Sequence, residues 1–283
     1  MQRLARAKIN LALHVTGQRA DDYHLIDSLV TFAEYGDVIA IEPAHDITLS
    51  IDGPFAEKLN TSANNLVLKA AKGLSELDAA PNTGAAIHLT KNLPVASGIG
   101  GGSADAAATL SALIDFWKFS PDRKVLQSLA LSLGADVPMC LTGRPCIARS
   151  IGDELTSISL PAMNMVLANP LTTVSTPSVF KALTSKNNAP LEAAHSFANI
   201  AACIDYLNRQ RNDLFEPSLS IAPEIGECFA ALKQSGADFV SMSGSGATCF
   251  GIYAEAIEKA EQAALKIQHD HPKWWVQATT TIE

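Results

Sequence analysis

The stretch PVASGIGGGSADAA, residues 94–107, places four glycines within five positions and then continues as a run of helix-forming residues. Glycines let successive backbone N–H groups converge on one point, because no Cβ stands in the way. The helix that follows offers N–H groups without intrahelical partners and roughly half a positive charge at its N-terminus. The stretch predicts a loop that binds phosphate groups, although a glycine-rich turn that only caps a buried helix would have the same sequence.

Other nucleotide-binding loops do not match this stretch. The chain contains no Gly-Lys-Ser or Gly-Lys-Thr, which excludes the P-loop. The third glycine of the dinucleotide-binding pattern is replaced by Ser103 or by Asp105, depending on where the pattern starts. No His-Arg-Asp or Asp-Phe-Gly occurs, so the protein-kinase pattern is absent as well. A different class of nucleotide loop remains.

The composition favours a compact globular protein. The 283 residues are 47% hydrophobic, which suffices for one large domain or two of ordinary size. Apolar runs such as residues 165–168 are much shorter than a membrane span, and the first residues lack the apolar block of a signal peptide. We therefore expect a cytoplasmic protein that does not bind membranes. A formal net charge of −8 without clusters of lysine and arginine argues against nucleic acid as a partner.

The cysteines are odd in number, widely spaced and mostly within apolar stretches: Cys140, Cys146, Cys203, Cys228 and Cys249. This pattern favours reduced thiols in the core over a disulfide framework or a zinc site. Because the chain is acidic and has no basic cluster, polyphosphate binding must use backbone N–H groups, a helix N-terminus, one or two lysines and a divalent cation.

The first half of the chain begins with predicted strands. Residues 5–15 alternate between apolar and other side chains, which predicts a half-buried strand with Lys8 and Asn10 on one face. These two polar side chains should project side by side. Further strands are expected at residues 26–32, 38–42, 47–51 and 87–90, and a helix at residues 65–77.

Two helices are expected after the glycine-rich stretch. The first has Ser103 as its N-cap, because serine accepts hydrogen bonds from the first turn of a helix. The second starts at residues 120–121, a serine followed by proline, and ends at Gly134 in the left-handed conformation.

Asp136 follows in an apolar turn, where Val137 should be extended because Pro138 disfavours the helical conformation before it. An aspartate with few polar neighbours either pairs with a cation or bonds to local N–H groups. This stretch alone leaves both interpretations open.

The second half of the chain predicts two β–α–β passes over one antiparallel sheet, which is a ferredoxin-like arrangement. The domain boundary is expected near residue 160, with domains at residues 1–160 and 161–283. The strands are expected at residues 165–168, 239–242, 248–253 and 274–282, and the longer helices at residues 197–207, 222–234 and 254–267.

Three motifs in this order resemble the GHMP kinase superfamily, named for galactokinase, homoserine kinase, mevalonate kinase and phosphomevalonate kinase. They are residues 7–11 (AKINL), residues 94–107, and residues 243–248 (SGSGAT). The resemblance implies an α+β fold with two domains, an ATP-binding domain like domain 2 of ribosomal protein S5 and a ferredoxin-like C-terminal domain. It also implies ATP and Mg²⁺ as the cosubstrate and cofactor.

Within that superfamily, residues 17–24, 133–138 and 212–217 resemble the kinases that phosphorylate the 2-hydroxyl of a cytidyl substrate in the non-mevalonate route to isoprenoid precursors. The chain departs from the family pattern at several positions. Ala96 and Asp22 replace glycines, Ile99 replaces a leucine, and Ala104 replaces a serine, which leaves Ser103 or the backbone to contact phosphate.

The resemblance assigns catalysis to Asp136 as the general base and to Lys8, whose ammonium orients the hydroxyl and offsets the charge on the transferred group. It assigns ATP binding to Pro94, Val95, Ala96, Ser97, Gly98, Ile99, Gly100, Gly101, Gly102, Ser103 and Ala104, and to Asn65 and Lys91. It assigns substrate binding to Asn10, Tyr23, His24, Asp136, Thr176, Pro177 and Phe180.

Two alternatives remain beside this hypothesis. Another kinase of the superfamily, acting on homoserine or mevalonate, is disfavoured by Tyr23, His24 and Phe180, which match a pocket for the cytosine base. A non-catalytic nucleotide-binding sensor is disfavoured because Lys8 and Asp136 are both present. We expect small-molecule partners only, and a monomer or a weak homodimer.

Overall fold

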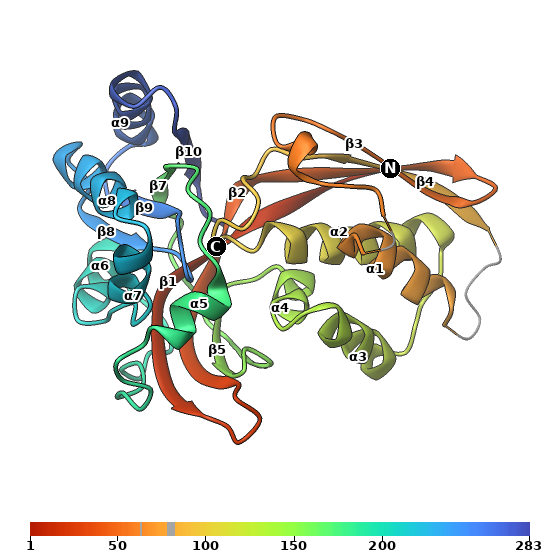
Figure 1. Cartoon of the computed structure of the whole chain (residues 1–283), viewed down its shortest axis with the longest axis horizontal. Helices are drawn as coiled ribbons and strands as arrows, with labels where there is room; N and C mark the ends of the chain where they lie inside the picture. Colours follow the sequence, from red (N-terminus) through yellow and green to blue (C-terminus); the bar gives the residue numbers. More distant parts are fainter. Residues whose placement is uncertain (63, 78–82) are drawn as a thin grey trace. The chain divides into compact units, whose positions relative to one another are not determined.

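A computed structural model describes residues 1–62, 64–77 and 83–283, and its helices and strands are labelled in Figure 1. The chain forms two compact units. Unit 1 comprises residues 1–7, 35–95 and 100–143, and unit 2 comprises residues 8–34, 96–99 and 144–283. Two long paired strands, β1 (Gln2–Gln18) and β2 (His24–Ala44), each contribute residues to both units. The domain boundary near residue 160 stays a prediction.

Unit 1 packs helices against a small sheet. The second half of β2 pairs antiparallel with β4 (Gly84–Thr90), which pairs parallel with β3 (Ile47–Asp52). The helices α1 and α2 lie along one face of these strands (Figure 1) and bury Val67, Leu74 and Leu110 against Ile87. The helices of this unit are the 3-10 helix η1 (Ala56–Lys58), α1 (Leu66–Ser75), α2 (Gly101–Trp117), α3 (Arg123–Leu133) and α4 (Val137–Thr142).

Unit 2 contains a four-stranded antiparallel sheet in the order β10-β7-β9-β8, with bounds Trp275–Thr280, Asn164–Asn169, Cys249–Tyr253 and Phe239–Met242. Two helices, α8 (Glu224–Gln234) and α9 (Ile257–Asp270), pack on it through Leu232 and Ile267. Together with α8 and α9, the strands follow the chain order β–α–β–β–α–β, which is the ferredoxin-like arrangement expected from the sequence.

The connection between β7 and β8 also holds three short helices, α5 (Thr176–Lys181), α6 (Ile200–Leu207) and α7 (Phe215–Ile221). The first half of β2 pairs with β5 (Cys146–Ser150), which pairs with β6 (Glu154–Ser157). The sequence patterns did not predict β5, β6 or α7.

The strands expected at residues 26–32 and 38–42 are parts of the single strand β2. Gly36 lies between these two predicted strands. In the structure, Gly36 allows a close approach between backbones, because a Cβ on it would lie 2.0 Å from the carbonyl oxygen of Ala5.

The predicted helix starts in unit 1 need correction. The helix α2 begins at Gly101 with Gly100 as its N-cap rather than Ser103, and the Ala104 N–H donates its bond to the Gly100 carbonyl at 2.8 Å. The helix α3 begins at Arg123, since the Asp122 carboxylate caps it by accepting bonds from two backbone N–H groups. A start at residues 120–121 was therefore wrong.

The turn between α3 and α4 also differs from the prediction. Gly134 has φ +159° and ψ 152°, which is extended rather than left-handed helical. Val137 is the first residue of α4 rather than an extended residue, because Pro138 can occupy the first turn of a helix, where its missing N–H costs nothing.

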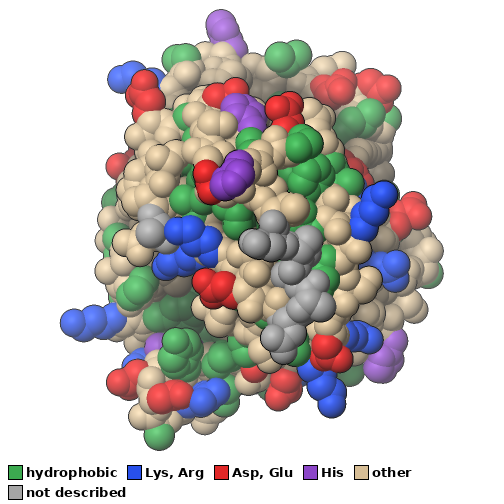
Figure 2. Space-filling model, turned by 90° about the vertical axis from the view of Figure 1, so that its right-hand side faces the viewer, with side chains coloured by type: hydrophobic (Ala, Val, Ile, Leu, Met, Phe, Trp, Pro, Cys, Tyr) green, Lys and Arg blue, Asp and Glu red, His purple; other side chains and the backbone are tan. Residues whose placement is uncertain are grey.

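All five cysteines are thiols rather than disulfides, and four of them are buried, which confirms that prediction. None of the helices in the described part of the chain combines the length and the hydropathy that crossing a bilayer requires. On the face shown in Figure 2, lysine and arginine side chains are scattered among aspartate and glutamate rather than gathered in one patch.

Candidate active site

Lys8 and Asn10 lie two residues apart on β1, so their side chains share one face of the strand. The Lys8 ammonium donates to Asn10 Oδ1 at 2.9 Å, and both residues are buried. Asn10 Nδ2 in turn donates to Ser28 Oγ at 2.8 Å, which turns the amide oxygen toward the lysine. The side-by-side arrangement predicted from the alternation is confirmed.

The third motif packs on the first motif and on residues 96–99 of the glycine loop, all within unit 2. The Ser243 hydroxyl accepts from the Asn10 backbone N–H at 3.0 Å and donates to the Gly98 carbonyl at 2.9 Å. The Thr248 N–H donates to the Ser97 carbonyl at 3.1 Å, and a Cβ on Gly98 would lie 2.4 Å from the Ser243 oxygen. The three motifs are therefore held together by backbone contacts that glycine makes possible.

Asn212 supports this third motif, which the sequence analysis did not foresee. Its Nδ2 donates to the carbonyls of Met242 and Gly244 at 2.7 and 2.8 Å. The Ser218 hydroxyl adds a bond to the Ser245 carbonyl at 2.9 Å. The stretch at residues 212–217 thus fixes the loop at residues 243–248.

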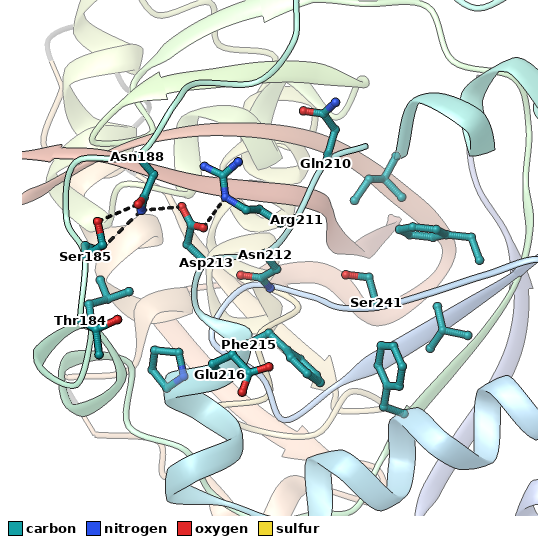
Figure 3. Close-up of a pocket in the computed structure, with 16 residues that line it drawn as sticks. Thr184, Ser185, Asn188, Gln210, Arg211, Asn212, Asp213, Phe215, Glu216 and Ser241 are labelled. Carbon is teal, nitrogen blue, oxygen red and sulfur yellow. Dashed lines mark hydrogen bonds and ion pairs between the residues drawn. The ribbon is translucent and has the colours of Figure 1, made fainter. Parts of the chain in front are cut away.

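Asn212 also lines a pocket of about 480 Å³ in unit 2 (Figure 3). Next to it, the Asp213 carboxylate accepts from Arg211 Nε at 2.6 Å and from Asn188 Nδ2 at 3.0 Å. A further bond from the Val15 N–H to Asp213 at 2.7 Å ties this wall to β1. The charged groups on this side of the pocket are therefore already paired with each other.

The second half of the glycine loop lies in unit 1, where Gly101, Gly102 and Ser103 form the first turn of α2. Because this helix has 17 residues, its free N–H groups and dipole suit a polyphosphate. Asn65 caps α1 by accepting from the Val67 N–H at 2.9 Å. Lys91 is buried and paired with carboxylates of unit 1.

Asp136 is the N-cap residue of α4 and is half-buried, but its side chain makes no capping bond to that helix. Asp136 lies in unit 1 and Lys8 in unit 2. Their joint action on one substrate stays a prediction.

The predicted cytosine-binding residues lie in unit 2. The ring of His24 stacks on that of Phe180, with centroids 4.6 Å apart and an interplanar angle of 28°. Burial, and then the positive charge of Lys186, lower the pKa of His24. Its Nε2 is buried and has no hydrogen-bond partner among the described residues. Tyr23 next to it is 59% exposed.

Thr176 begins the short helix α5, with Pro177 following in its first turn. The Thr176 hydroxyl lies 2.8 Å from Ser245 Oγ, so the start of α5 contacts the third motif. Two predicted substrate residues are therefore placed beside the loop at residues 243–248.

Two of the departures from the family pattern have backbones that suit glycine. Ala96 has φ +52° and Asp22 has φ +68°, both in the left-handed region. The resemblance therefore located two positions of glycine-like conformation, although other residues stand there.

Comparison with known proteins agrees with these features. Residues 65–144 match the GHMP kinases N terminal domain, and residues 188–273 match the GHMP kinases C terminal domain. A homoserine kinase from Cytophaga hutchinsonii has the same fold, with a TM-score of 0.66 at 19% identity over 98% of this chain and 95% of that one. The fold and the site thus define a GHMP kinase, and the predicted α+β class is confirmed.

The more similar proteins carry one name. The 4-diphosphocytidyl-2-C-methyl-D-erythritol kinase of Rhizobium leguminosarum bv. trifolii is 52% identical over 98% of this chain and 94% of its own length. That of Agrobacterium fabrum is 50% identical over 98% and 95%. A crystal structure of 4-(cytidine 5'-diphospho)-2C-methyl-D-erythritol kinase matches with a TM-score of 0.82 at 33% identity over the whole of both chains. The chain belongs to the 4-diphosphocytidyl-2-C-methyl-D-erythritol kinase family, whose members are phosphotransferases with an alcohol acceptor.

Proposed function

We propose that this chain transfers the γ-phosphate of ATP to the 2-hydroxyl of 4-diphosphocytidyl-2-C-methyl-D-erythritol and releases ADP and the 2-phosphate. The observation that carries the proposal is the near-complete match to kinases of that name at about half identical residues. Homoserine kinase and mevalonate kinases match at 19% and 13% identity, which supports a shared fold only. Neither alternative is favoured over the cytidyl substrate.

Phosphoryl transfer asks the protein mainly to position the reactants and to stabilise negative charge. The hydroxyl oxygen forms a bond to the γ-phosphorus while the bond to the bridging oxygen of ADP breaks. In the proposed mechanism, the hydroxyl proton passes to Asp136. General-base catalysis of this kind raises the rate roughly 10²–10⁴-fold. Lys8, held by Asn10 at 2.9 Å, offsets the charge that gathers on the transferred group.

The His24 and Phe180 pair is the proposed cytosine site. A stacked aromatic pair offers a face to a base, and a buried ring nitrogen without a partner can bond to the base edge. Neutral imidazole suits that role, because the lowered pKa of His24 keeps the ring uncharged near neutral pH. Tyr23, exposed beside this pair, is free to cover the other face of the base.

The glycine-rich N-terminus of α2 suits the triphosphate of ATP, the cosubstrate of GHMP kinases. Mg²⁺ bound to ATP would neutralise phosphate charge during transfer. Within residues 1–62, 64–77 and 83–283, no group of three or more His, Cys, Asp or Glu side chains gathers as a metal site. The Mg²⁺ requirement, the cytoplasmic location and the monomeric or weakly dimeric state stay predictions.

A coupled assay for ADP tests the reaction. We expect ADP to form with ATP and the cytidyl substrate, and only background amounts with homoserine, with mevalonate or with no acceptor. Equal rates with homoserine or mevalonate would contradict the substrate assignment. ADP formation that is independent of any acceptor would contradict the transferase assignment.

A second experiment tests the cytosine site. Phe180→Ala and His24→Ala should each raise the KM for the cytidyl substrate about tenfold and leave the KM for ATP unchanged, because base stacking is worth about 1–3 kcal/mol. Phe197→Ala is the matched control, since Phe197 contacts Tyr206 in an edge-to-face pair elsewhere in unit 2. Equal increases in both KM values would remove the pair from cytosine binding.

A further inference from the structure

Three charged side chains are buried together in unit 1, apart from the groups used in the mechanism above. Lys91 Nζ lies 2.5 Å from Asp37 Oδ2 and 2.7 Å from Asp105 Oδ2. The three side chains are 3%, 0% and 4% exposed, respectively. We call them the charge cluster. Burying three charged groups is costly unless they are paired, so their position calls for an explanation.

The charge cluster joins the segment that enters the glycine loop to the helix that leaves it. Asp37 Oδ1, on β2, accepts from the backbone N–H groups of Asn92 and Leu93 at 2.6 and 2.8 Å. Asp105 is the fifth residue of α2, and Lys91 follows directly after β4. The side-chain contacts of Asp37, Lys91 and Asp105 therefore hold β2, residues 91–93 and the first turns of α2 together.

Gly101, the first residue of α2, rests directly on this cluster. A Cβ on Gly101 would lie 3.1 Å from Lys91 Nζ and 3.6 Å from Asp37 Oδ2. The cluster is thus immediately behind the helix N-terminus whose N–H groups suit phosphate. Any net charge of the cluster acts on an anion bound at that N-terminus.

We propose that Asp37, Lys91 and Asp105 position the N-terminus of α2 for ATP. The charge cluster that packs against this N-terminus carries no net charge. Lys91 then acts on ATP through the loop, as a positioning residue. This inference rests on the proposed function of the loop. Its new content is that the Asp105 carboxyl group controls the affinity for the triphosphate without touching ATP.

Electrostatics support the neutral state. Burial raises the pKa of Asp105 to about 8, and the Asp37 carboxylate adds to this, while the Lys91 ammonium opposes it. For Lys91, the two carboxylates outweigh burial and raise the pKa of its ammonium. At neutral pH these shifts favour the charged ammonium of Lys91 and the protonated form of Asp105. Asp105 Oδ1 is buried and none of the described residues hydrogen-bonds to it, which a neutral carboxyl tolerates better than a carboxylate.

Other charged groups on the elements around α2 are few. On β2, Tyr35 lies close enough for the Asp37 carboxylate to raise the pKa of its phenol, after burial. The helix α1 carries Lys69 and Lys72, both exposed, and Asp136 begins α4. The charged groups that act on Asp105 are the other two members of the cluster, Lys91 and Asp37.

The test compares Asp105→Asn with the wild type in calorimetric titrations with ATP and Mg²⁺ at pH 7 and pH 9.5. In the wild type, Asp105 loses its proton over this range, so we expect ATP affinity to fall by about threefold to tenfold. Asp105→Asn should match the wild type at pH 7 within about twofold and should not weaken at pH 9.5. Asp115→Asn, on the exposed surface of the same helix, is the control and should behave as the wild type.

A measurement on the wild type alone covers the case in which Asp105→Asn does not fold. Bound triphosphate favours the protonated form of Asp105, so ATP binding at pH 8.5 should take up about a quarter to a half of a proton. Titrations in buffers of different ionisation enthalpy measure this uptake. Absent uptake, or identical pH dependence in Asp105→Asn and the wild type, would overturn the inference.

These results separate the inference from the proposed function. Kinase activity on the cytidyl substrate with no effect of Asp105→Asn on the pH dependence would refute the inference alone. The expected pH dependence of ATP binding without phosphorylation of the cytidyl substrate would refute the proposed function and leave the inference standing.

Discussion

At the residue scale, each polar side chain of the site is oriented by a neighbour from a distant part of the sequence. Asn10 presents its oxygen to the Lys8 ammonium because its amide nitrogen is bound to Ser28. The Ser243 hydroxyl accepts a hydrogen bond from the Asn10 N–H and donates one to the Gly98 carbonyl. The orientation of Lys8 therefore depends on a chain of bonds that ends in the glycine loop.

This arrangement makes Lys8 a test of the chemistry. Lys8→Ala should lower kcat by about 10²–10³-fold, because removing one group that stabilises transition-state charge costs that much in comparable sites. Lys266→Ala is the control, since Lys266 is exposed and pairs with Asp270 on α9. Steady-state kinetics and melting curves are measured for both. A kcat near that of the wild type in Lys8→Ala would exclude Lys8 from catalysis.

Ala96 tests the conformation of the loop. A non-glycine residue in the left-handed region costs about 1–2 kcal/mol, and a glycine costs about 0.5–1 kcal/mol in unfolded-chain entropy. Because Ala96 has φ +52°, Ala96→Gly should raise the free energy of unfolding by about 0.5 kcal/mol. Ala231→Gly, within α8, should lower it by about 1 kcal/mol. Urea denaturation measures both, and a loss in Ala96→Gly would contradict the assigned backbone.

At the scale of elements, helix starts are set by the side chain whose geometry reaches the free N–H groups. Asp122 accepts from the N–H groups of Lys124 and Val125, whereas Ser120 lies outside the cap. In α2 the start is made by Gly100 and Gly101, and Gly101 rests against Lys91. The phosphate-binding end of α2 is thus determined by packing behind it rather than by a capping side chain.

Replacing these two candidate caps gives opposite results. Asp122→Ala should lower the free energy of unfolding by about 1 kcal/mol, because two bonds to the first turn of α3 are lost. Ser120→Ala should change it by less than about 0.5 kcal/mol. Chemical denaturation compares the two variants. A larger loss in Ser120→Ala would restore the start predicted from the sequence.

At the scale of the whole molecule, the predicted site residues are divided between the two units. Unit 2 holds Lys8, Asn10, residues 96–99 and the aromatic pair, while unit 1 holds the start of α2 and Asp136. The strands β1 and β2 run through both units. Each unit also has its own hydrophobic core.

The stability of the molecule should depend on the protonation of His14. Its Nδ1 lies 3.0 Å from the Ala189 carbonyl, and its Nε2 accepts from the Arg211 N–H at 3.2 Å. Burial, and then the charge of Arg211, lower the pKa of His14 below the ordinary 6.5. Below pH 6.5 the unfolded chain therefore binds a proton that the folded chain does not.

The contribution of His14 to the free energy of unfolding should accordingly be present above pH 6.5 and be lost as the pH falls. Urea denaturation at pH 7.5, 6.5 and 5.5, points chosen around that ordinary value, measures the loss. The loss in the free energy of unfolding should be smaller in His14→Gln than in the wild type. His195→Gln, at an exposed position, is the control and should show the same loss as the wild type. Equal losses in all three proteins would exclude His14 as the group responsible.

Local patterns predicted much of the fold and part of the site. The alternation at residues 5–15 predicted the shared face of Lys8 and Asn10, and the glycine-rich stretch predicted the helix that follows it. Other features depended on distant contacts. The strands expected at residues 26–32 and 38–42 are one strand, in which Gly36 packs against the backbone of Ala5. Asn212 gained its role only through the carbonyls of residues 242 and 244.

The class of protein could be predicted without coordinates, because glycine spacing, period-two alternation and the order of three motifs are properties of the sequence. The tertiary structure alone decided how those motifs are held. Asp37, Lys91 and Asp105 are separated by 54 and 14 positions, and only the folded chain brings them into one buried cluster. Charges far apart in sequence interact strongly only where folding removes the water between them.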